Sequence, residues 1–113
     1  MQVPIVKSLD VLADKPQRIM TSEELQLLEK AFAENYPILL DDIHQASGIN
    51  HTEKTVFLLT ALGYKPAQIQ RLVDLSSSQI TNMKSKLNLI LFNEKTAVNL
   101  YNNIVNRYSV YTR

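Results

Sequence analysis

The sequence predicts an all-α protein of about six helices, and three observations carry this prediction. Gly occurs twice and Pro four times in 113 residues, which is too few turn residues for an all-β fold of many short strands. Apolar residues recur at helical spacing along most of the chain. Helix-start pairs, in which a capping side chain precedes Glu or Gln by three residues, occur at Thr21–Glu24, Asn50–Glu53 and Ser76–Gln79.

Residues 1–20 carry the weakest pattern, and we interpret them as a linker or arm because chain termini are often loose. The alternative is a short helix, since Ile5, Leu9 and Leu12 are spaced like one helix face and Pro16 would end it.

Residues 21–48 are predicted to form an N-terminal helical pair. Thr21 caps the first helix, whose apolar stripe comprises Leu25, Leu28, Phe32 and Tyr36. Pro37 suits the first turn of a second helix, whose apolar face comprises Leu39, Leu40 and Ile43. Gly48 is the expected stop of that helix.

Residues 49–108 are predicted to contain four further helices. The first begins after Asn50 and ends at Gly63, and the second is short and starts at Pro66. The third runs from Ser76 to about Phe92, and Asn93 is expected to cap the last helix. The apolar positions of the four are Val56, Phe57, Leu59, Leu62, Ile69, Leu72, Val73, Ile80, Met83, Leu87, Ile90, Leu91, Val98, Tyr101, Ile104, Val105 and Tyr108. Among those of the third helix, Ile80, Met83 and Leu87 are expected in the core.

The composition excludes several classes of protein. Hydrophobic residues make up 45% and charged residues 20%, which allows a packed core in one domain. With no Cys and two His, a disulfide framework, a zinc–thiolate site or a cofactor site is not expected. No apolar run reaches the ~20 residues that span a bilayer, and the N-terminus does not resemble a signal peptide. We therefore expect a cytoplasmic protein that does not contact a membrane.

The net charge of +1 hides a strong polarity along the chain. Residues 21–53 carry −6, whereas residues 64–92 carry +3 and residues 93–113 carry +2. The near-neutral total charge therefore does not exclude binding to nucleic acid, but it predicts that such binding is weak. The acidic first half would repel the phosphates, so the nucleic acid could approach in only one orientation.

The order of elements from Glu53 to Phe92 is that of a helix-turn-helix: a long helix, a short helix, a tight turn over Val73–Ser76 and a second long helix. That last helix begins with small hydrogen-bonding side chains, as entry into the ~12 Å major groove requires. The predicted DNA-binding residues are Lys65, Ser76, Ser77, Ser78, Gln79, Thr81, Asn82, Lys84, Ser85 and Lys86.

Four segments resemble the LuxR/GerE-type helix-turn-helix at the C-terminus of bacterial sensory regulators. They are Ile49–Glu53 (INHTE), Leu59–Gly63 (LTALG), Tyr64–Ile69 (YKPAQI) and Leu75–Leu87 (LSSSQITNMKSKL), and the resemblance covers roughly residues 22–105. It implies a transcription regulator, or its output domain behind an upstream sensor. In this resemblance Asn82 matches a polar residue of the recognition helix and Ser76 its cap. The segment from Thr96 to Ile104 matches the element through which such domains often dimerise.

The resemblance has departures: Ile90 stands where the family has a basic residue, Phe92 where it has Gly, and Gln68, Gln70 and Gln79 replace Glu, Ala and Thr. The favoured hypothesis is a DNA-binding transcription regulator that acts as a homodimer and has no catalytic activity. The expected dimer residues are Val98, Tyr101, Ile104, Val105 and Tyr108. Tyr101, Tyr108 and Tyr111 could equally form a buried hinge of the last helix or a surface for self-association. The alternative is a protein-interaction or dimerisation module with this fold and little DNA affinity, which Ile90 and the acidic first half favour.

Overall fold

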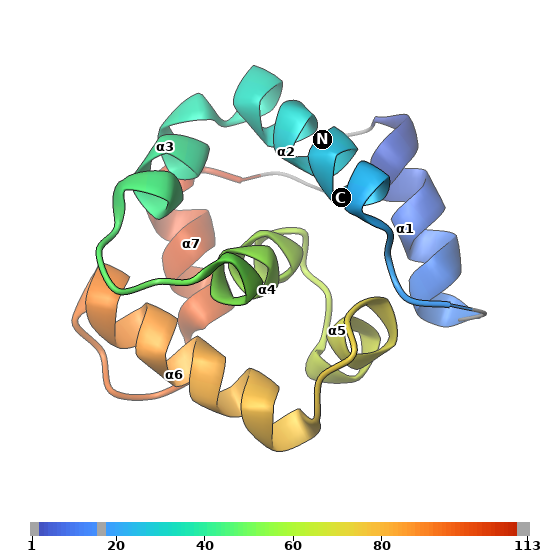
Figure 1. The fold of residues 1–113 in the computed structure, drawn as a ribbon. Helices are drawn as coiled ribbons and strands as arrows, with labels where there is room; N and C mark the ends of the chain where they lie inside the picture. The colour runs from blue at the N-terminus through green and yellow to red at the C-terminus, as the bar shows by residue number, and fades with distance from the viewer. Residues whose placement is uncertain (1–2, 16–17, 111–113) are drawn as a thin grey trace.

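A computed structural model describes residues 3–15 and 18–110 of the chain. These residues form seven helices and no strand, which confirms the all-α prediction (Figure 1). No helix among them is both long and apolar enough to cross a membrane. The helices are α1 (Pro4–Asp14), α2 (Ser22–Asn35), α3 (Pro37–Gln45), α4 (His51–Ala61), α5 (Pro66–Leu72), α6 (Ser77–Phe92) and α7 (Leu100–Tyr108).

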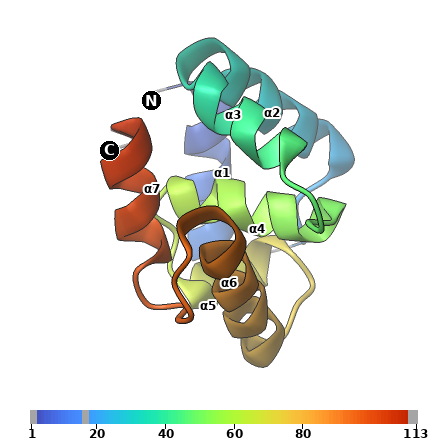
Figure 2. The ribbon, with the colours of Figure 1, turned by 90° about the vertical axis from the view of Figure 1, so that its left-hand side faces the viewer.

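Helix α4 lies at the centre of the molecule, and the other helices surround it (Figures 1 and 2). Helices α3, α5, α6 and α7 pack directly on it. Phe57, Leu58 and Leu59 are consecutive, and each is at most 1% exposed. The sequence predicts one buried side for this helix, whereas the structure buries it on nearly every side because neighbours pack all round it.

The prediction of a linker or arm at residues 1–20 is wrong for most of that segment, because Pro4–Asp14 forms α1. Its Ile5, Leu9 and Leu12 are buried, as the alternative interpretation required. Helix α1 packs against α5 and α2, which gives these side chains a surface to cover. Pro16, the expected stop, lies outside the described residues.

Helix α1 is fastened to the α4–α5 region by polar contacts as well as by packing. The Tyr64 hydroxyl donates a hydrogen bond to the Asp10 carboxylate (2.6 Å), and the Arg71 guanidinium donates to the Ala13 carbonyl (2.9 Å). Because Arg71 belongs to α5, α1 directly supports the first helix of the predicted helix-turn-helix.

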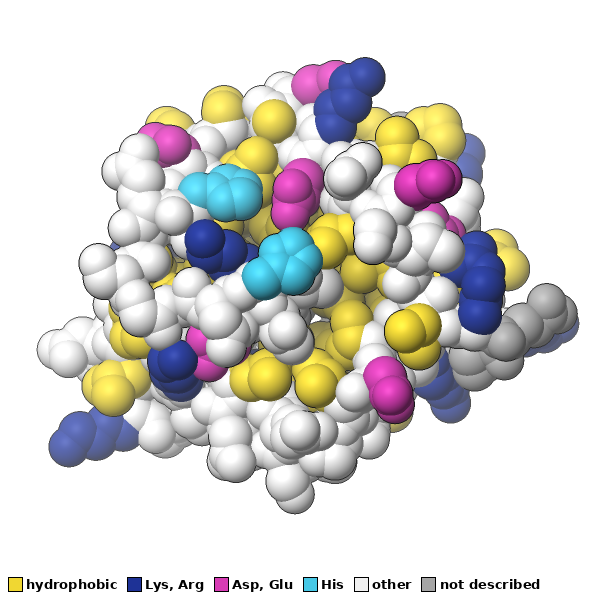
Figure 3. Space-filling model, viewed as in Figure 1, with side chains coloured by type: hydrophobic (Ala, Val, Ile, Leu, Met, Phe, Trp, Pro, Cys, Tyr) yellow, Lys and Arg dark blue, Asp and Glu magenta, His cyan; other side chains and the backbone are white. Residues whose placement is uncertain are grey.

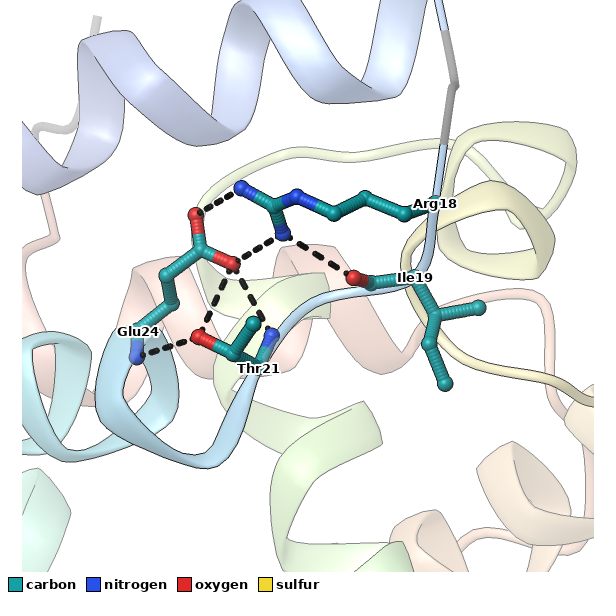
Figure 4. A network of polar contacts seen from close by, with 4 residues as sticks. All are labelled: Arg18, Ile19, Thr21 and Glu24. Carbon is teal, nitrogen blue, oxygen red and sulfur yellow. Dashed lines mark hydrogen bonds and ion pairs between the residues drawn. The ribbon is translucent and has the colours of Figure 1, made fainter.

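The start of α2 confirms the predicted capping box (Figure 4). The Thr21 hydroxyl accepts from the Glu24 amide (3.1 Å), and the Glu24 carboxylate accepts from the Thr21 amide (2.9 Å). Arg18 donates to both oxygens of the same carboxylate, at 2.6 and 3.2 Å. The hydrogen bond from Arg18, helped by those from Thr21, lowers the pKa of Glu24 from 4.5 to about 2.

The N-terminal pair is confirmed, with Pro37 as the first residue of α3 and Tyr36 as the joint between the two helices. Leu28 and Phe32 of the predicted stripe are fully buried. Helix α3 ends at Gln45, so Gly48 does not stop it directly. Gly48 instead takes a positive φ of 79° in the loop that leads to α4.

The prediction that Asn93 caps the last helix is wrong. Asn93 closes α6 in the left-handed conformation (φ 56°), and α7 begins only at Leu100. The intervening loop wraps around Asn88, which is fully buried; its amide donates to the Thr96 carbonyl (2.6 Å) and its oxygen accepts from Asn103 (2.8 Å). These bonds satisfy a buried amide and hold the loop in place.

We predict that Leu9→Ala lowers the free energy of unfolding by about 2–5 kcal/mol, because it leaves a cavity beneath α1. Val11→Ala is the control, since Val11 lies on the same helix and is 68% exposed; its effect should stay within about 0.5 kcal/mol. Urea unfolding followed by circular dichroism measures both. Equal, small effects would show that α1 is not part of the cooperative fold.

We predict that Glu24→Gln destabilises the protein in a pH-dependent way. The folded pKa of Glu24 is depressed, so its contribution is present above the ordinary value of 4.5 and is lost as the pH falls toward about 2. The gap between wild type and Glu24→Gln in urea unfolding should therefore be largest near pH 6 and shrink between pH 4.5 and pH 2. Glu23→Gln, an exposed neighbour in the same turn, is the control. A gap that is constant with pH would refute this account.

Candidate nucleic-acid interface

Helices α5 and α6 have the arrangement that the sequence predicts for a helix-turn-helix. Four residues, Val73–Ser76, separate the two helices, which pack against each other and against α4. Ile69 and Leu72 of α5 and Ile80 and Leu87 of α6 are fully buried in the shared core. Met83, expected in the core, is only partly buried, as is Leu91, and the apolar Ile90 is 41% exposed.

The start of α6 is fixed by the predicted capping box. The Ser76 hydroxyl accepts from the Gln79 amide (3.1 Å), and the Gln79 side-chain oxygen accepts from the Ser76 amide (2.8 Å). These two residues therefore position the helix, and the NH₂ group of Gln79 and the hydroxyl hydrogen of Ser76 are left as donors to a ligand. Lys65 stands in the same place before α5, where its backbone amide donates to the Gln68 side chain (2.9 Å).

The first half of α6 exposes a row of small polar side chains. Ser77, Ser78, Thr81 and Asn82 are exposed, and Ser85 is half-buried. None of them is large enough to hold a facing surface away from the helix. The helix has 16 residues and is therefore about 24 Å long, so its first half alone could enter a groove.

Lys86 does not point its charge freely into solvent. Its ammonium lies 2.9 and 3.0 Å from the two carboxylate oxygens of Glu53, a residue of α4 that is only 5% exposed. The same carboxylate accepts from the Asn50 amide at the start of α4 (2.8 Å). Lys86 thus joins α6 to α4. Sequence reasoning missed this role because Glu53 lies 33 residues away along the chain.

The other two lysines of the predicted site have no ion-pair partner among the described residues. Lys65 is exposed between α4 and α5, and Lys84 is half-buried on α6. Burial lowers the pKa of Lys84. Two of the three predicted phosphate contacts are therefore available for a ligand.

Part of the positive charge of the second half is used inside the molecule. Arg71 binds the Ala13 carbonyl, and Arg107 donates to the Leu91 carbonyl (2.8 Å) and stacks over the Phe92 ring at 4.4 Å. In Figure 3 the lower edge of the molecule, over the first half of α6, shows mainly uncharged side chains. The interface is therefore polar rather than strongly cationic.

The predicted dimer residues do not form one exposed seam. Ile104 is fully buried in the core of its own chain, so it does not reach a second copy. Tyr108 and Val105 are half-buried, and the Tyr108 hydroxyl donates to the Asp42 carboxylate (2.6 Å). Burial, together with this bond, raises the pKa of Tyr108 to about 12. Val98 and Tyr101 are exposed by 85% and 40%, while Tyr111 lies outside the described residues.

Side chains that commonly bind metal ions do not gather in the part of the chain that the structure describes. His44 and His51 are both exposed, and no three His, Cys, Asp or Glu side chains gather there as ligands for an ion.

Searches against protein-family models, curated proteins and solved structures returned no match to this chain.

We predict that Lys86→Met lowers the free energy of unfolding by about 1–2 kcal/mol, because it leaves the buried Glu53 carboxylate without its cation. The expected loss of stability is small because the Lys86 side chain is 44% exposed and solvent screens the ion pair. Lys84→Met, which breaks no ion pair, is the matched control.

A double-mutant cycle with Glu53→Gln isolates the coupling of the pair in urea unfolding. A coupling energy indistinguishable from zero would contradict the proposed link between α4 and α6.

Proposed function

We propose that this chain binds double-stranded DNA through α6 and regulates transcription. The observation that carries the proposal is the α5–turn–α6 arrangement, in which the first half of α6 exposes mainly small, hydrogen-bonding side chains. A helix of this kind fits the major groove without steric conflict. The sequence resemblance to LuxR/GerE-type domains supports the same function.

In this proposal the residues of the site divide into two groups. Ser78, Thr81 and Asn82 contact base edges, and an Asn side chain is suited to adenine, which offers one acceptor and one donor in the major groove. Lys65 and Lys84 contact phosphates and set the position of the helix on the duplex. Lys86 acts mainly by holding α6 against α4.

Binding by a single copy is expected to be weak. Each phosphate contact contributes about one unit to the salt slope, so two available lysines imply a shallow slope. A homodimer would double the contacts and place two copies of α6 on neighbouring half-sites. The exposed Val98 and Tyr101 are the candidates for that dimer contact, since Ile104 belongs to the core.

We predict that the protein binds mixed-sequence duplex DNA in low salt, with an affinity that falls as salt rises. Lys84→Ala should reduce the slope of log K against log salt by about one unit, and Lys86→Ala by less, because Lys86 is already paired with Glu53. Lys30→Ala on α2 is the control and should leave the slope unchanged.

Fluorescence anisotropy across a salt series measures all four proteins. Binding that is absent in low salt, or that is equally weakened by Lys30→Ala, would refute DNA recognition through α6.

A second candidate function is a protein-interaction module. It is favoured by the second half of α6, where Leu89 and Ile90 are 46% and 41% exposed, and by the pairing of Lys86. Exposed apolar residues suit a protein partner better than a phosphate backbone. Absence of salt-dependent DNA binding by a folded protein would favour this candidate.

A further inference from the structure

A shallow groove lies between α2 and α3. Its volume is about 360 Å³, and its lining is mostly apolar; we call it the α2–α3 groove, and its residues are Ala33, Pro37, Ile38, Leu40, Asp41 and His44. Ile38 is the most prominent of these residues, because 71% of it is exposed to solvent. A large aliphatic side chain so exposed, with apolar neighbours around it, is suited to cover by another molecule.

The surroundings of the α2–α3 groove are acidic. Between residues 29 and 45 the chain carries Glu29, Glu34, Asp41 and Asp42 against Lys30 alone. Asp41 lies in the groove itself and Glu34 follows Ala33, and neither forms an ion pair with a described residue. Figure 3 shows hydrophobic and acidic side chains along the upper edge, over α2 and α3, with a basic side chain among them.

The location of the groove separates it from the proposed DNA interface. Helix α4 lies between the α2–α3 pair and the first half of α6, as both ribbon views show (Figures 1 and 2). The negative charge around the α2–α3 groove would repel a phosphate backbone. The groove is therefore not an extension of the nucleic-acid interface, and its use does not depend on DNA binding.

We propose that the α2–α3 groove binds an amphipathic helix of a partner protein whose polar face is basic. The apolar side of such a helix, with residues at i, i+3, i+4 and i+7, covers Ile38 and Leu40. Its Lys or Arg side chains meet Asp41 and Glu34 at the edge of the contact. Charge complementarity selects this partner, because an acidic or neutral helix would leave these carboxylates unpaired.

The test uses a fluorescein-labelled synthetic peptide of about 14 residues, with Leu on one helix face and Lys on the other. We expect it to bind the full chain, and to bind more weakly as salt increases. The same peptide with Glu in place of every Lys is the ligand control and should not bind. Equal binding of both peptides would overturn the role of charge.

Two variants locate the contact. Ile38→Ser should weaken binding of the Lys peptide about tenfold, since Ile38 is the main apolar contact. Leu27→Ser removes an aliphatic side chain of α2 that is 53% exposed and lies outside the groove, so it should change the affinity by less than about twofold. Ile38 and Leu27 are both exposed, so we expect these two variants to fold, which circular dichroism verifies. A third variant, Asp41→Asn, tests the charge contact and should flatten the salt dependence of peptide binding. A salt dependence unchanged from wild type would overturn the role of charge.

Three further outcomes would overturn the proposal: no binding of the Lys peptide in low salt, loss of affinity in Leu27→Ser equal to that in Ile38→Ser, or a homodimer that dissociates on Ile38→Ser. The last, measured by sedimentation at several protein concentrations, would assign the groove to a second copy of this chain.

Discussion

The burial of α4 is the constraint on which the rest of the structure depends. Four helices pack directly on a segment of 11 residues, so its side chains must be apolar on nearly every side or must satisfy their polar groups locally. Thr55 and Thr60 meet the second condition, because each hydroxyl donates to the carbonyl four residues earlier, at 3.1 and 2.8 Å. Among the described residues no buried side-chain nitrogen or oxygen lacks a partner.

The start of α4 is where this constraint reaches the candidate site. Glu53 caps the helix and is then buried, so its carboxylate needs a cation, which Lys86 supplies from α6. The same contact holds α6 against α4 and removes a positive charge from the surface that we propose as the DNA interface. In that proposal, the Lys86 ammonium cannot stabilise the core and bind a phosphate at the same time.

The helices before α4 add a second level of organisation. Helix α1 covers α5 and is fastened to it by Arg71, so the first half of the chain supports the helix-turn-helix rather than trailing from it. The acidic residues of α2 and α3 remain on the other side of α4, apart from the first half of α6. The charge polarity of the sequence thus becomes a difference between surfaces, with acidic side chains on α2 and α3 and mainly uncharged polar side chains on the first half of α6.

Local signals in the sequence were sufficient for the fold class and for the starts of α2 to α6. Thr21, Asn50 and Ser76 each bind a residue three positions on, and a contact of that range needs only the two side chains and the local backbone between them. Pro37 and Pro66 likewise begin helices, because proline has no amide to leave unpaired. The exposed polar start of α6 followed from the same reasoning, since periodicity determines which face points outward.

What the sequence by itself determined is therefore the all-α class, the starts of α2 to α6 and the order of the helix-turn-helix. Only the tertiary structure decided that residues 4–14 form a packed helix, because the surface of α5 is needed to cover Leu9. It also decided that Ile104 fills the core of its own chain and does not face a partner. It also decided that Lys86 pairs with Glu53 and that the loop after Asn93 closes around Asn88. Each of these depends on packing between separate elements, and residues brought together in that way leave no periodic pattern along the chain.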